Sequence, residues 1–394
     1  METKMPNNWK KYKLHQVAEI KYGKDHKLLK SGSIPVYGSG GIMRYGDNFL
    51  YDKPSILIPR KGTLSNLFYV DKPFWSVDTM FWSKIEEGTL PKYLFYNLKT
   101  LDFASMDVGS AVPSLTTELL NRIDITLPSL PEQQAIAEIL SSLDDKIELN
   151  LQTNKTLEEM ANALYKHWFV DFGPFKTGKF IESELGMIPE GWEVKPFYQI
   201  AKYINGTSIK QNQITEPNKG RPIVKIAELK QGITEQTKWS NVNFDSRYIF
   251  NTSDLLFSWS GNPHTSIDVF IWDKMESILN QHIFKVVPEL HLEKPFVFFS
   301  LKYYMETFIT LATRKQTTGL GHFTNEDLKN NYIIVPSISV HENYNSIAAN
   351  YFELIYKNLI ENQTLKQTRD YLLPKLISGE IQVKQAAKLV KQVL

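Results

Sequence analysis

An internal repeat constrains this chain more than any other feature, because the 394 residues are written as two copies in the same order. Trp9–Ala18 resembles Trp192–Ala201, which lies 183 residues later, and Thr116–Pro128 resembles Thr324–Pro336 at a separation of 208. Three further pairs of segments match between these points, and their separation rises from 187 to 203. Chance similarity among β-rich stretches is the alternative, but it does not explain the conserved order. We expect two copies of one fold, the second with longer loops.

Each copy begins with short apolar runs that Gly, Pro, Asn and Asp interrupt, which is the pattern of strands and turns. Examples are Ser55–Pro59, Leu67–Val70 and Val269–Trp272. Pro91–Leu98 and Pro295–Met305 are expected to be helices, since proline is accepted in the first turn of a helix.

Each copy ends in a long helix, which we expect at residues 132–168 and 340–376. Steps of four and three residues alternate along the first helix, which gives an unbroken heptad seam. The members of this seam are Ile136, Leu140, Leu143, Ile147, Asn150, Asn154, Leu157, Ala161, Leu164 and Trp168. The second seam lies 208 residues later and consists of Tyr344, Ala348, Tyr351, Ile355, Asn358, Asn362, Leu365, Arg369, Leu372 and Leu376.

The two helices are expected to form an antiparallel coiled coil, because a pseudo-two-fold axis between two copies of one unit reverses the second helix. This pairing would bring Asn150, Asn154, Asn358 and Asn362 together. Buried Asn is costly in a seam but fixes its register; the alternative is that these side chains face solvent. A seam of roughly 37 residues is about 55 Å long, so the two β-rich domains would sit at opposite ends of a rod.

Composition limits the partners and the compartment. The 45 basic and 43 acidic side chains give a net charge of only +2, so any DNA-binding surface must be local. The absence of Cys excludes disulfides, thiolate metal sites and cysteine nucleophiles. We expect neither a signal peptide nor a membrane span, because no apolar run approaches the ~20 residues that a span needs. A cytoplasmic location is therefore expected.

Catalytic motifs are not convincing anywhere in the chain. Gly173 to Gly178 and Lys179 have the spacing of a phosphate-binding loop, but Phe180 replaces the Ser or Thr that would hold magnesium. Glu193–Lys195 resembles the end of a nuclease motif, yet no suitably spaced Asp precedes it. The eight His never occur at metal-ligand spacing. The sequence predicts no metal site and no catalytic residue.

The loops between the repeated segments are candidates for DNA contact, because they differ between the copies and carry small, polar or basic residues. The candidates in the first copy are Ser39, Gly40, Gly41, Arg60, Lys61, Thr63, Ser110 and Ser114. Those in the second copy are Lys225, Trp259, Ser260, Asn262, Arg314, Lys315, Thr317, Thr318 and His322. For each, the alternative is an ordinary turn or a solvated loop.

Four segments resemble conserved regions of the specificity subunits of type I restriction-modification systems, the HsdS family. They are Leu127–Ile136, Trp168–Pro174, Ile188–Trp192 and Leu372–Ile381, and their order matches that of the family. One departure is Ser339–Asn343, which lacks the Pro-Glu-Gln-Gln form of the first copy and is expected to weaken at most one docking contact.

The resemblance implies an α+β fold with two β-rich target recognition domains, each followed by a long helix. It implies that each domain reads half of a bipartite site in the major groove of double-stranded DNA. It also implies two methyltransferase subunits that carry S-adenosylmethionine, and restriction subunits that use ATP and magnesium. The chain itself would be non-catalytic, bind no cofactor and contact no membrane.

The expected domains follow from the repeat. They are target recognition domain 1 (1–130), spacer helix 1 (131–170), a linker (171–191), target recognition domain 2 (192–336), spacer helix 2 (337–378) and a tail (379–394). Because the loops of the two copies differ, we expect two unlike half-sites. Outward apolar residues are candidates for partner docking, or for packing on the chain's own domains: Ile139, Leu149, Met160, Ile347 and Ile360. The competing functions are a coiled-coil adaptor and a fragment of a fused methyltransferase-nuclease.

Overall fold

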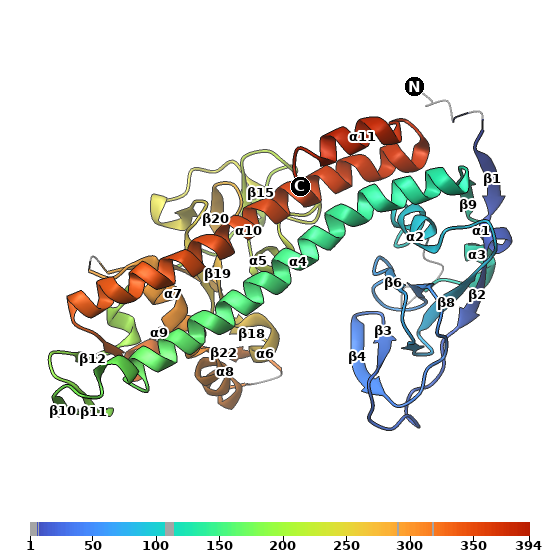
Figure 1. Cartoon of the computed structure of the whole chain (residues 1–394). Coiled ribbons are helices and arrows are strands. Elements are labelled where there is room, and N and C mark those ends of the chain that lie inside the picture. The colour runs from blue at the N-terminus through green and yellow to red at the C-terminus, as the bar shows by residue number, and fades with distance from the viewer. Residues whose placement is uncertain (1–5, 7, 107–113, 290, 317–318) are drawn as a thin grey trace. The chain divides into compact units, whose positions relative to one another are not determined.

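The computed structural model describes residue 6 and residues 8–106, 114–289, 291–316 and 319–394. The chain divides into two compact units (Figure 1): Met1–Glu148 with Thr364–Leu394, and Leu149–Gln363. Each unit therefore contains one copy of the repeat and part of each long helix.

The first unit contains short strands and helices followed by the start of a long helix. Its elements are β1 (Lys10–Lys13), α1 (Leu14–Val17), β2 (Ala18–Tyr22), β3 (Ile34–Gly38), β4 (Gly41–Gly46), β5 (Ser55–Pro59), β6 (Phe68–Val70), β7 (Trp75–Ser76), β8 (Met80–Ile85), α2 (Pro91–Lys99), α3 (Thr117–Asn121), β9 (Asp124–Leu127), and parts of α4 (Leu130–Phe169) and α10 (Ile338–Ser378), with α11 (Val383–Val390). The main sheet has the order β2-β8-β5-β6, a smaller sheet has the order β4-β3-β7, and β1 pairs with β9.

The second unit repeats this plan with additional strands. Its elements are β10 (Phe180–Ser183), β11 (Gly186–Pro189), β12 (Glu193–Pro196), β13 (Ala201–Asn205), β14 (Arg221–Val224), α5 (Ile226–Gln231), β15 (Trp239–Ser240), β16 (Ile249–Phe250), β17 (Leu255–Ser258), β18 (Ser260–Gly261), α6 (Pro263–Ser266), β19 (Asp268–Ile271), β20 (Ser277–Leu279), β21 (Ile283–Pro288), α7 (Lys294–Tyr303), α8 (Met305–Arg314), β22 (Gly321–His322), α9 (Asn325–Asn330) and β23 (Tyr332–Val335). The orders β13-β21-β17-β19 and β15-β14-β20-β16 correspond to the two sheets of the first unit, and β12 pairs with β23 as β1 pairs with β9.

The central strands β5 and β17 explain why each unit has two apolar cores. Successive side chains of a strand point to opposite faces, so a strand that is buried on both faces is apolar throughout. Ile56 and Ile58 of β5 belong to the core on the helix side, whereas Leu57 belongs to the core beneath the smaller sheet. In β17, Leu255 and Phe257 face the helix-side core, while Leu256 faces the smaller one.

Helix α2 packs between the main sheet and the start of α4 in the first unit (Figure 1). The buried amide of Gln133 connects these elements, because its Oε1 accepts a hydrogen bond from the Leu90 backbone N (2.8 Å) and its Nε2 donates to the Pro128 carbonyl (3.0 Å). At the corresponding position of the second unit, the buried His341 packs edge-on against Phe296 of α7. Gln133 therefore has a structural role within its own unit.

The long helices α4 and α10 pair antiparallel within each unit. In the first unit, Leu140 near the start of α4 shares a core with Leu372 near the end of α10. In the second unit, Leu157 in the later part of α4 shares a core with Tyr344 and Ala348 near the start of α10. At about 1.5 Å per residue, the 40 residues of α4 extend for about 60 Å.

Most positions of the heptad seams are buried. The buried members are Ile136, Leu140, Leu143, Ile147, Asn150, Asn154, Leu157, Ala161, Tyr344, Ala348, Ile355, Asn358, Asn362, Leu365, Leu372 and Leu376. Leu164, Trp168, Tyr351 and Arg369 are half-buried. The guanidinium of Arg369 donates to Asp144 Oδ1 (2.7 Å), and Tyr96 Oη donates to Asp144 Oδ2 (2.8 Å). The charged Arg369 is therefore accommodated in the seam by pairing with the Asp144 carboxylate.

Two segments are more ordered than the sequence predicted. The expected linker contains the hairpin β10–β11, and the expected tail contains α11, whose Ala386 and Val390 are buried in the core of the first unit. Across the described part of the chain, no helix combines the length and the apolar character needed to cross a bilayer.

Candidate nucleic-acid interface

The same backbone hydrogen bonds occur in both units at the point where β2, β5 and β7, or β13, β17 and β20, end. In the first unit, each of these bonds runs from a backbone N to a carbonyl O: Gly23 to Met80 (2.9 Å), Lys24 to Ser76 (2.9 Å), Val77 to Tyr37 (3.0 Å), Met80 to Val77 (2.9 Å), Arg60 to Thr79 (2.9 Å) and Leu115 to Arg60 (2.9 Å). The second unit repeats them: Gly206 to Ile283 (3.1 Å), Thr207 to Leu279 (3.0 Å), Asn280 to Val224 (3.2 Å), Ile283 to Asn280 (3.2 Å), Trp259 to His282 (3.3 Å) and Phe323 to Trp259 (2.8 Å). The separations of the paired residues match those of the sequence repeat, so the two units present equivalent surfaces here.

A pair of glycines allows the chain segments to approach closely at this point. A Cβ atom at Gly23 would lie 2.0 Å from the Val77 carbonyl oxygen, and one at Gly206 would lie 2.1 Å from the Asn280 carbonyl oxygen. Neither position has room for a side chain, because the nearest atoms belong to the backbone. The backbone frame of both surfaces is therefore fixed by the fold.

The first strand-end surface consists of Tyr22, Arg60, Lys61, Asp78 and Ser114. Arg60 Nε donates to the Asp78 carbonyl oxygen (3.0 Å), and its guanidinium lies 5.9 Å from the centroid of the Tyr22 ring. Lys61 forms an isolated antiparallel bridge with Ser114. A guanidinium, an ammonium, a carboxylate and a phenol are thus presented together by different segments.

The glycine-rich turn between β3 and β4 lies beside this surface. Asn66 Nδ2 donates to the Ser39 carbonyl (2.9 Å), and a Cβ atom at Gly62 would lie 2.9 Å from Ser39 Oγ. Gly40 has open space around the position of a Cβ atom, and Gly41 has a φ of +111°, which favours glycine. Thr63 is exposed next to Gly62.

The second strand-end surface consists of Asn205, Trp259, Gln281 and His322, and the predicted contact Ser260 lies buried beneath it. Trp259 Nε1 donates to Asn205 Oδ1 (3.2 Å), which corresponds to the contact between Arg60 and Tyr22. Ser260 and His322 face each other in the β18–β22 pair, and Ser260 Oγ lies 2.9 Å from His322 Nδ1. This surface carries an indole, amides and an imidazole where the first carries charged groups.

His282 adds a second imidazole next to this surface. The centroid of the Trp259 ring lies 5.4 Å from that of His282 and 5.9 Å from that of His322, so the indole contacts both imidazoles. Burial, and to a smaller extent the proximity of His322, lowers the pKa of His282. A neutral imidazole offers both a donor and an acceptor at neutral pH.

The other predicted DNA contacts fall into three groups. Lys225 is exposed immediately after Val224, whose carbonyl accepts from Asn280, and Asn262 is exposed immediately before α6. Arg314 is exposed at the end of α8, whereas Lys315 forms an ion pair with Asp327 and so already has a partner. Ser110, Thr317 and Thr318 lie outside the described residues.

Five residues in or next to these surfaces were not predicted from the sequence. They are Tyr22, Asp78, Asn205, Gln281 and His282. The repeat relates Tyr22 to Asn205 at a separation of 183 and Asp78 to Gln281 at 203, but it pairs residues neither of which was predicted, so no sequence signal singles them out.

Known proteins share both the sequence and the fold. The family model described as the type I restriction modification DNA specificity domain matches residues 6–159 and 189–368. The type I restriction enzyme MjaIX specificity subunit of Methanocaldococcus jannaschii is 32% identical over 310 residues, which cover 76% of this chain and 71% of that protein. The chain belongs to the type I restriction-modification DNA specificity family. Its function is to provide DNA sequence specificity, and the specificity subunit is the non-catalytic part of such a system.

Two further comparisons are consistent with this membership. The type I restriction enzyme HindI specificity subunit of Haemophilus influenzae is 24% identical over 360 residues, which cover 74% of this chain and 78% of that protein. The crystal structure of the type I restriction-modification S subunit from M. genitalium has 17% sequence identity and a TM-score of 0.56, covering 95% of this chain and 98% of that one. The structural likeness supports the fold alone.

The described part of this specificity subunit has no clustering of three or more His, Asp or Glu that could hold a metal ion. The segment with phosphate-binding spacing, Gly173–Lys179, follows helix α4 and leads into strand β10. A phosphate-binding loop requires the opposite order, a strand followed by a helix.

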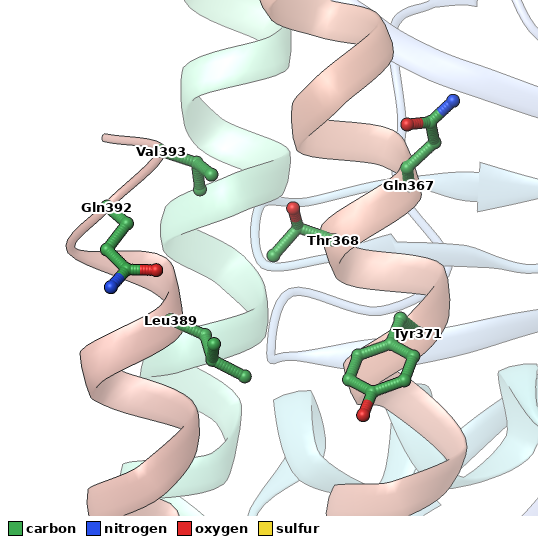
Figure 2. Close-up of a pocket in the computed structure, with 6 residues that line it drawn as sticks. All are labelled: Gln367, Thr368, Tyr371, Leu389, Gln392 and Val393. Carbon is green, nitrogen blue, oxygen red and sulfur yellow. The ribbon is translucent and has the colours of Figure 1, made fainter.

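A separate groove lies between α10 and α11 in the first unit. It has a volume of about 340 Å³, and Figure 2 shows that Thr368 and Tyr371 line it from one helix while Leu389 and Val393 line it from the other side. Tyr371 and Leu389 are both exposed.

Proposed function

We propose that the two strand-end surfaces are the base-reading surfaces of the specificity subunit, and that each contacts one half of a bipartite, asymmetric DNA target. The observation that carries this proposal is the equivalence of their backbone frames combined with the difference in their side chains. A guanidinium suits guanine edges and phosphates, whereas amide side chains suit adenine. Two unlike sets of side chains on one frame would read two unlike half-sites.

The proposal includes the division of the chain into functional parts. Residues 1–130 and 192–336 are the two target recognition domains, residues 131–170 and 337–378 the spacer helices, 171–191 the linker and 379–394 the tail. Asn262, whose amide suits adenine, is assigned to a base edge of the second half-site. The remaining candidate contacts near the surfaces are assigned to phosphates or base edges: Ser39, Gly40, Gly41, Thr63, Lys225 and Arg314.

The test uses the subunit in complex with its modification partners, and sequencing of methylated positions in a random DNA library. Arg60→Ala should reduce the preference for one base of the first half-site about tenfold, because one good side-chain contact discriminates by ~1–3 kcal/mol. Asn262→Ala should act only on the second half-site. It is used in place of a Trp259 variant because Trp259 is half-buried and stacks on Phe284, so its truncation would disturb packing.

Matched controls lie at the opposite ends of the same central strands. Lys53→Ala removes an exposed charge just before β5, and Asn251→Ala removes an exposed amide just before β17. Both controls should leave the target unchanged. Unchanged specificity in both Arg60→Ala and Asn262→Ala would overturn the proposal.

We also propose that two methyltransferase subunits dock on the long helices, and that restriction subunits complete the complex. S-adenosylmethionine, ATP and magnesium would belong to those partners. Leu149, Met160 and Ile347 support this proposal as exposed apolar side chains on α4 and α10, whereas Ile139 packs partly on the first unit's own core and Ile360 is half-buried.

Docking is tested by the charge substitution Met160→Lys, with Glu159→Gln, which changes the net charge by the same +1, as the matched control at the neighbouring exposed position. Met160→Lys should weaken co-purification with the methyltransferase subunits, and the control should not. An adaptor that binds only protein would keep its partners and show no salt-dependent DNA binding. A fused enzyme fragment would methylate DNA as an isolated chain.

A further inference from the structure

The turn between β7 and β8 presents Asp78 at the first strand-end surface, and the turn between β20 and β21 presents Gln281 at the corresponding point of the second. Backbone hydrogen bonds fix both turns on each side: Val77 and Thr79 are bonded in the first unit, and Asn280 and His282 in the second. Each side chain therefore projects from a rigid position that the fold, and not a mobile loop, determines.

Asp78 lies beside Arg60, a cation of its surface, but its carboxylate does not pair with it. Arg60 Nε donates to the backbone carbonyl of Asp78 (3.0 Å), while the Asp78 side chain is exposed. Within the described ranges, its carboxylate has neither a hydrogen bond nor an ion pair. A cationic donor and an anionic acceptor are thus displayed next to each other.

A free carboxylate on a DNA-facing surface is unfavourable unless it accepts a hydrogen bond. Each phosphate repels it by ~1 kcal/mol at 4 Å in water, and by more where water is excluded. In the major groove, the donors that offset this repulsion are the exocyclic amino groups of cytosine and adenine. Carboxylate oxygens accept bonds but donate none.

Gln281 offers an acceptor at the same point without a charge. Its Nε2 lies 3.1 Å from His282 Nε2, so the neighbouring imidazole can orient the amide. The amide of Gln can pair with adenine through both a donor and an acceptor, which a carboxylate cannot do. The two turns therefore present an acceptor oxygen from equivalent backbone positions, one on a charged group and one on a neutral amide.

We propose that Asp78 and Gln281 are specificity-determining residues, one for each half-site, whose side-chain oxygens accept a hydrogen bond from the exocyclic amino group of a base in the major groove. This inference rests on the proposed function of the strand-end surfaces. It assigns to a pair of turns a base-reading role that the charge pattern alone would not indicate.

The experiment is target selection from a random DNA library by the complete complex. Asp78→Asn changes a pure acceptor into a donor and acceptor of the same size, so it should alter the preference at one position of the first half-site about tenfold or more. Gln281→Ala should relax one position of the second half-site. In each variant the other half-site should stay unchanged.

The controls separate base reading from a general effect of charge. Asp71→Asn removes an exposed carboxylate after β6, at the opposite end of β5 from Arg60, and Asn251→Ala removes an exposed amide before β17. Asp71→Asn and Asp78→Asn remove the same charge, but only Asp78→Asn should change the selected sequence. If Asp78 merely faces phosphates, its neutralisation will strengthen binding to all sequences alike and the inference is wrong.

The outcomes also distinguish this inference from the proposal on which it rests. Unchanged half-sites in Asp78→Asn and Gln281→Ala, together with altered half-sites in Arg60→Ala and Asn262→Ala, would refute the role of the turns alone. Unchanged half-sites in all four variants would refute the reading surfaces themselves.

Discussion

At the scale of single residues, Gln133 and His341 show how one position serves different purposes in the two units. The Gln133 amide satisfies backbone groups of Leu90, Gly88 and Pro128 and so attaches α4 to its own unit. His341 instead lies against Phe296, and its Nδ1 has no hydrogen-bond partner within the described residues. Burial lowers the pKa of His341 from 6.5 to about 4. The folded protein therefore contains this imidazole in its neutral form.

This shift predicts a loss of stability in mild acid. A His whose pKa is lower in the folded protein than in the unfolded chain contributes its full stabilisation above the unfolded pKa. As the pH falls from 6.5 towards 4, the unfolded state gains protons that the folded state does not, so the free energy of unfolding decreases. The full loss is on the order of 3 kcal/mol at about 1.4 kcal/mol per pKa unit. Thermal melting between pH 7.5 and 4.5 should show this slope, and His341→Gln, which introduces the residue of the first unit, should reduce it. Equal slopes in the two proteins would contradict the assignment.

The two strand-end surfaces contain some residues that the sequence identified and others that it did not. Arg60 and Trp259 were identifiable because they follow the most apolar strands of their copies. Asp78 and Gln281 were not, because each is an isolated polar residue in a short turn. Only the hydrogen bonds of their neighbours bring those turns beside the end of the central strand. An acidic residue is moreover a poor candidate for DNA contact when judged by charge alone.

At the scale of elements, the heptad pattern predicted the long helices well. The expected ranges of 132–168 and 340–376 compare with Leu130–Phe169 and Ile338–Ser378. The strands around Ser55–Pro59 and the helices at Pro91 and Pro295 were also correct in type and place. Helix α11 was missed because it is short and its burial depends on the core of the first unit. Long periodic patterns specify an element locally, whereas short elements depend on tertiary packing.

The buried Asn pairs are the part of the helix pairing that is best suited to a stability test. Asn150 Nδ2 donates to Asn362 Oδ1 (2.9 Å) and to Glu361 Oε2 (2.7 Å). Asn358 Nδ2 donates to Asn154 Oδ1 (2.7 Å), and both of these side chains are buried. All of these contacts lie within the second unit.

A double-mutant cycle on the Asn154–Asn358 pair should be strongly non-additive. Asn154→Leu alone leaves a buried amide without its acceptor and should cost about 1–3 kcal/mol of unfolding free energy. The double substitution to Leu replaces both partners by apolar groups and should recover most of that loss. Denaturant unfolding measures the four proteins, and Lys155→Leu, at an exposed position of the same helix, is the control. If the effects of the two single substitutions simply add up in the double variant, the hydrogen bond between the two side chains contributes no stability of its own.

At the scale of the whole molecule, α4 and α10 are continuous helices that run through the division between the two units. That division falls between Glu148 and Leu149 and between Gln363 and Thr364. If the length of these helices sets the distance between two reading surfaces, it also sets the number of unread base pairs between the half-sites, as spacing does in other dimeric readers. The target would then be modular in three respects: two half-sites and one spacer.

The spacer prediction is tested by inserting one heptad into each helix at these division points. Seven residues add ~10.5 Å of helix, which corresponds to about three base pairs at 3.4 Å each, and they preserve the heptad seam. Sequencing of methylated sites should recover both original half-sites with a spacer longer by about three base pairs. Insertion in α4 alone breaks the register of the Asn pairs and should abolish assembly instead. An unchanged spacer in the double insertion would show that the helices do not measure the target, while changed half-sites would show that the reading surfaces are not independent of the helices.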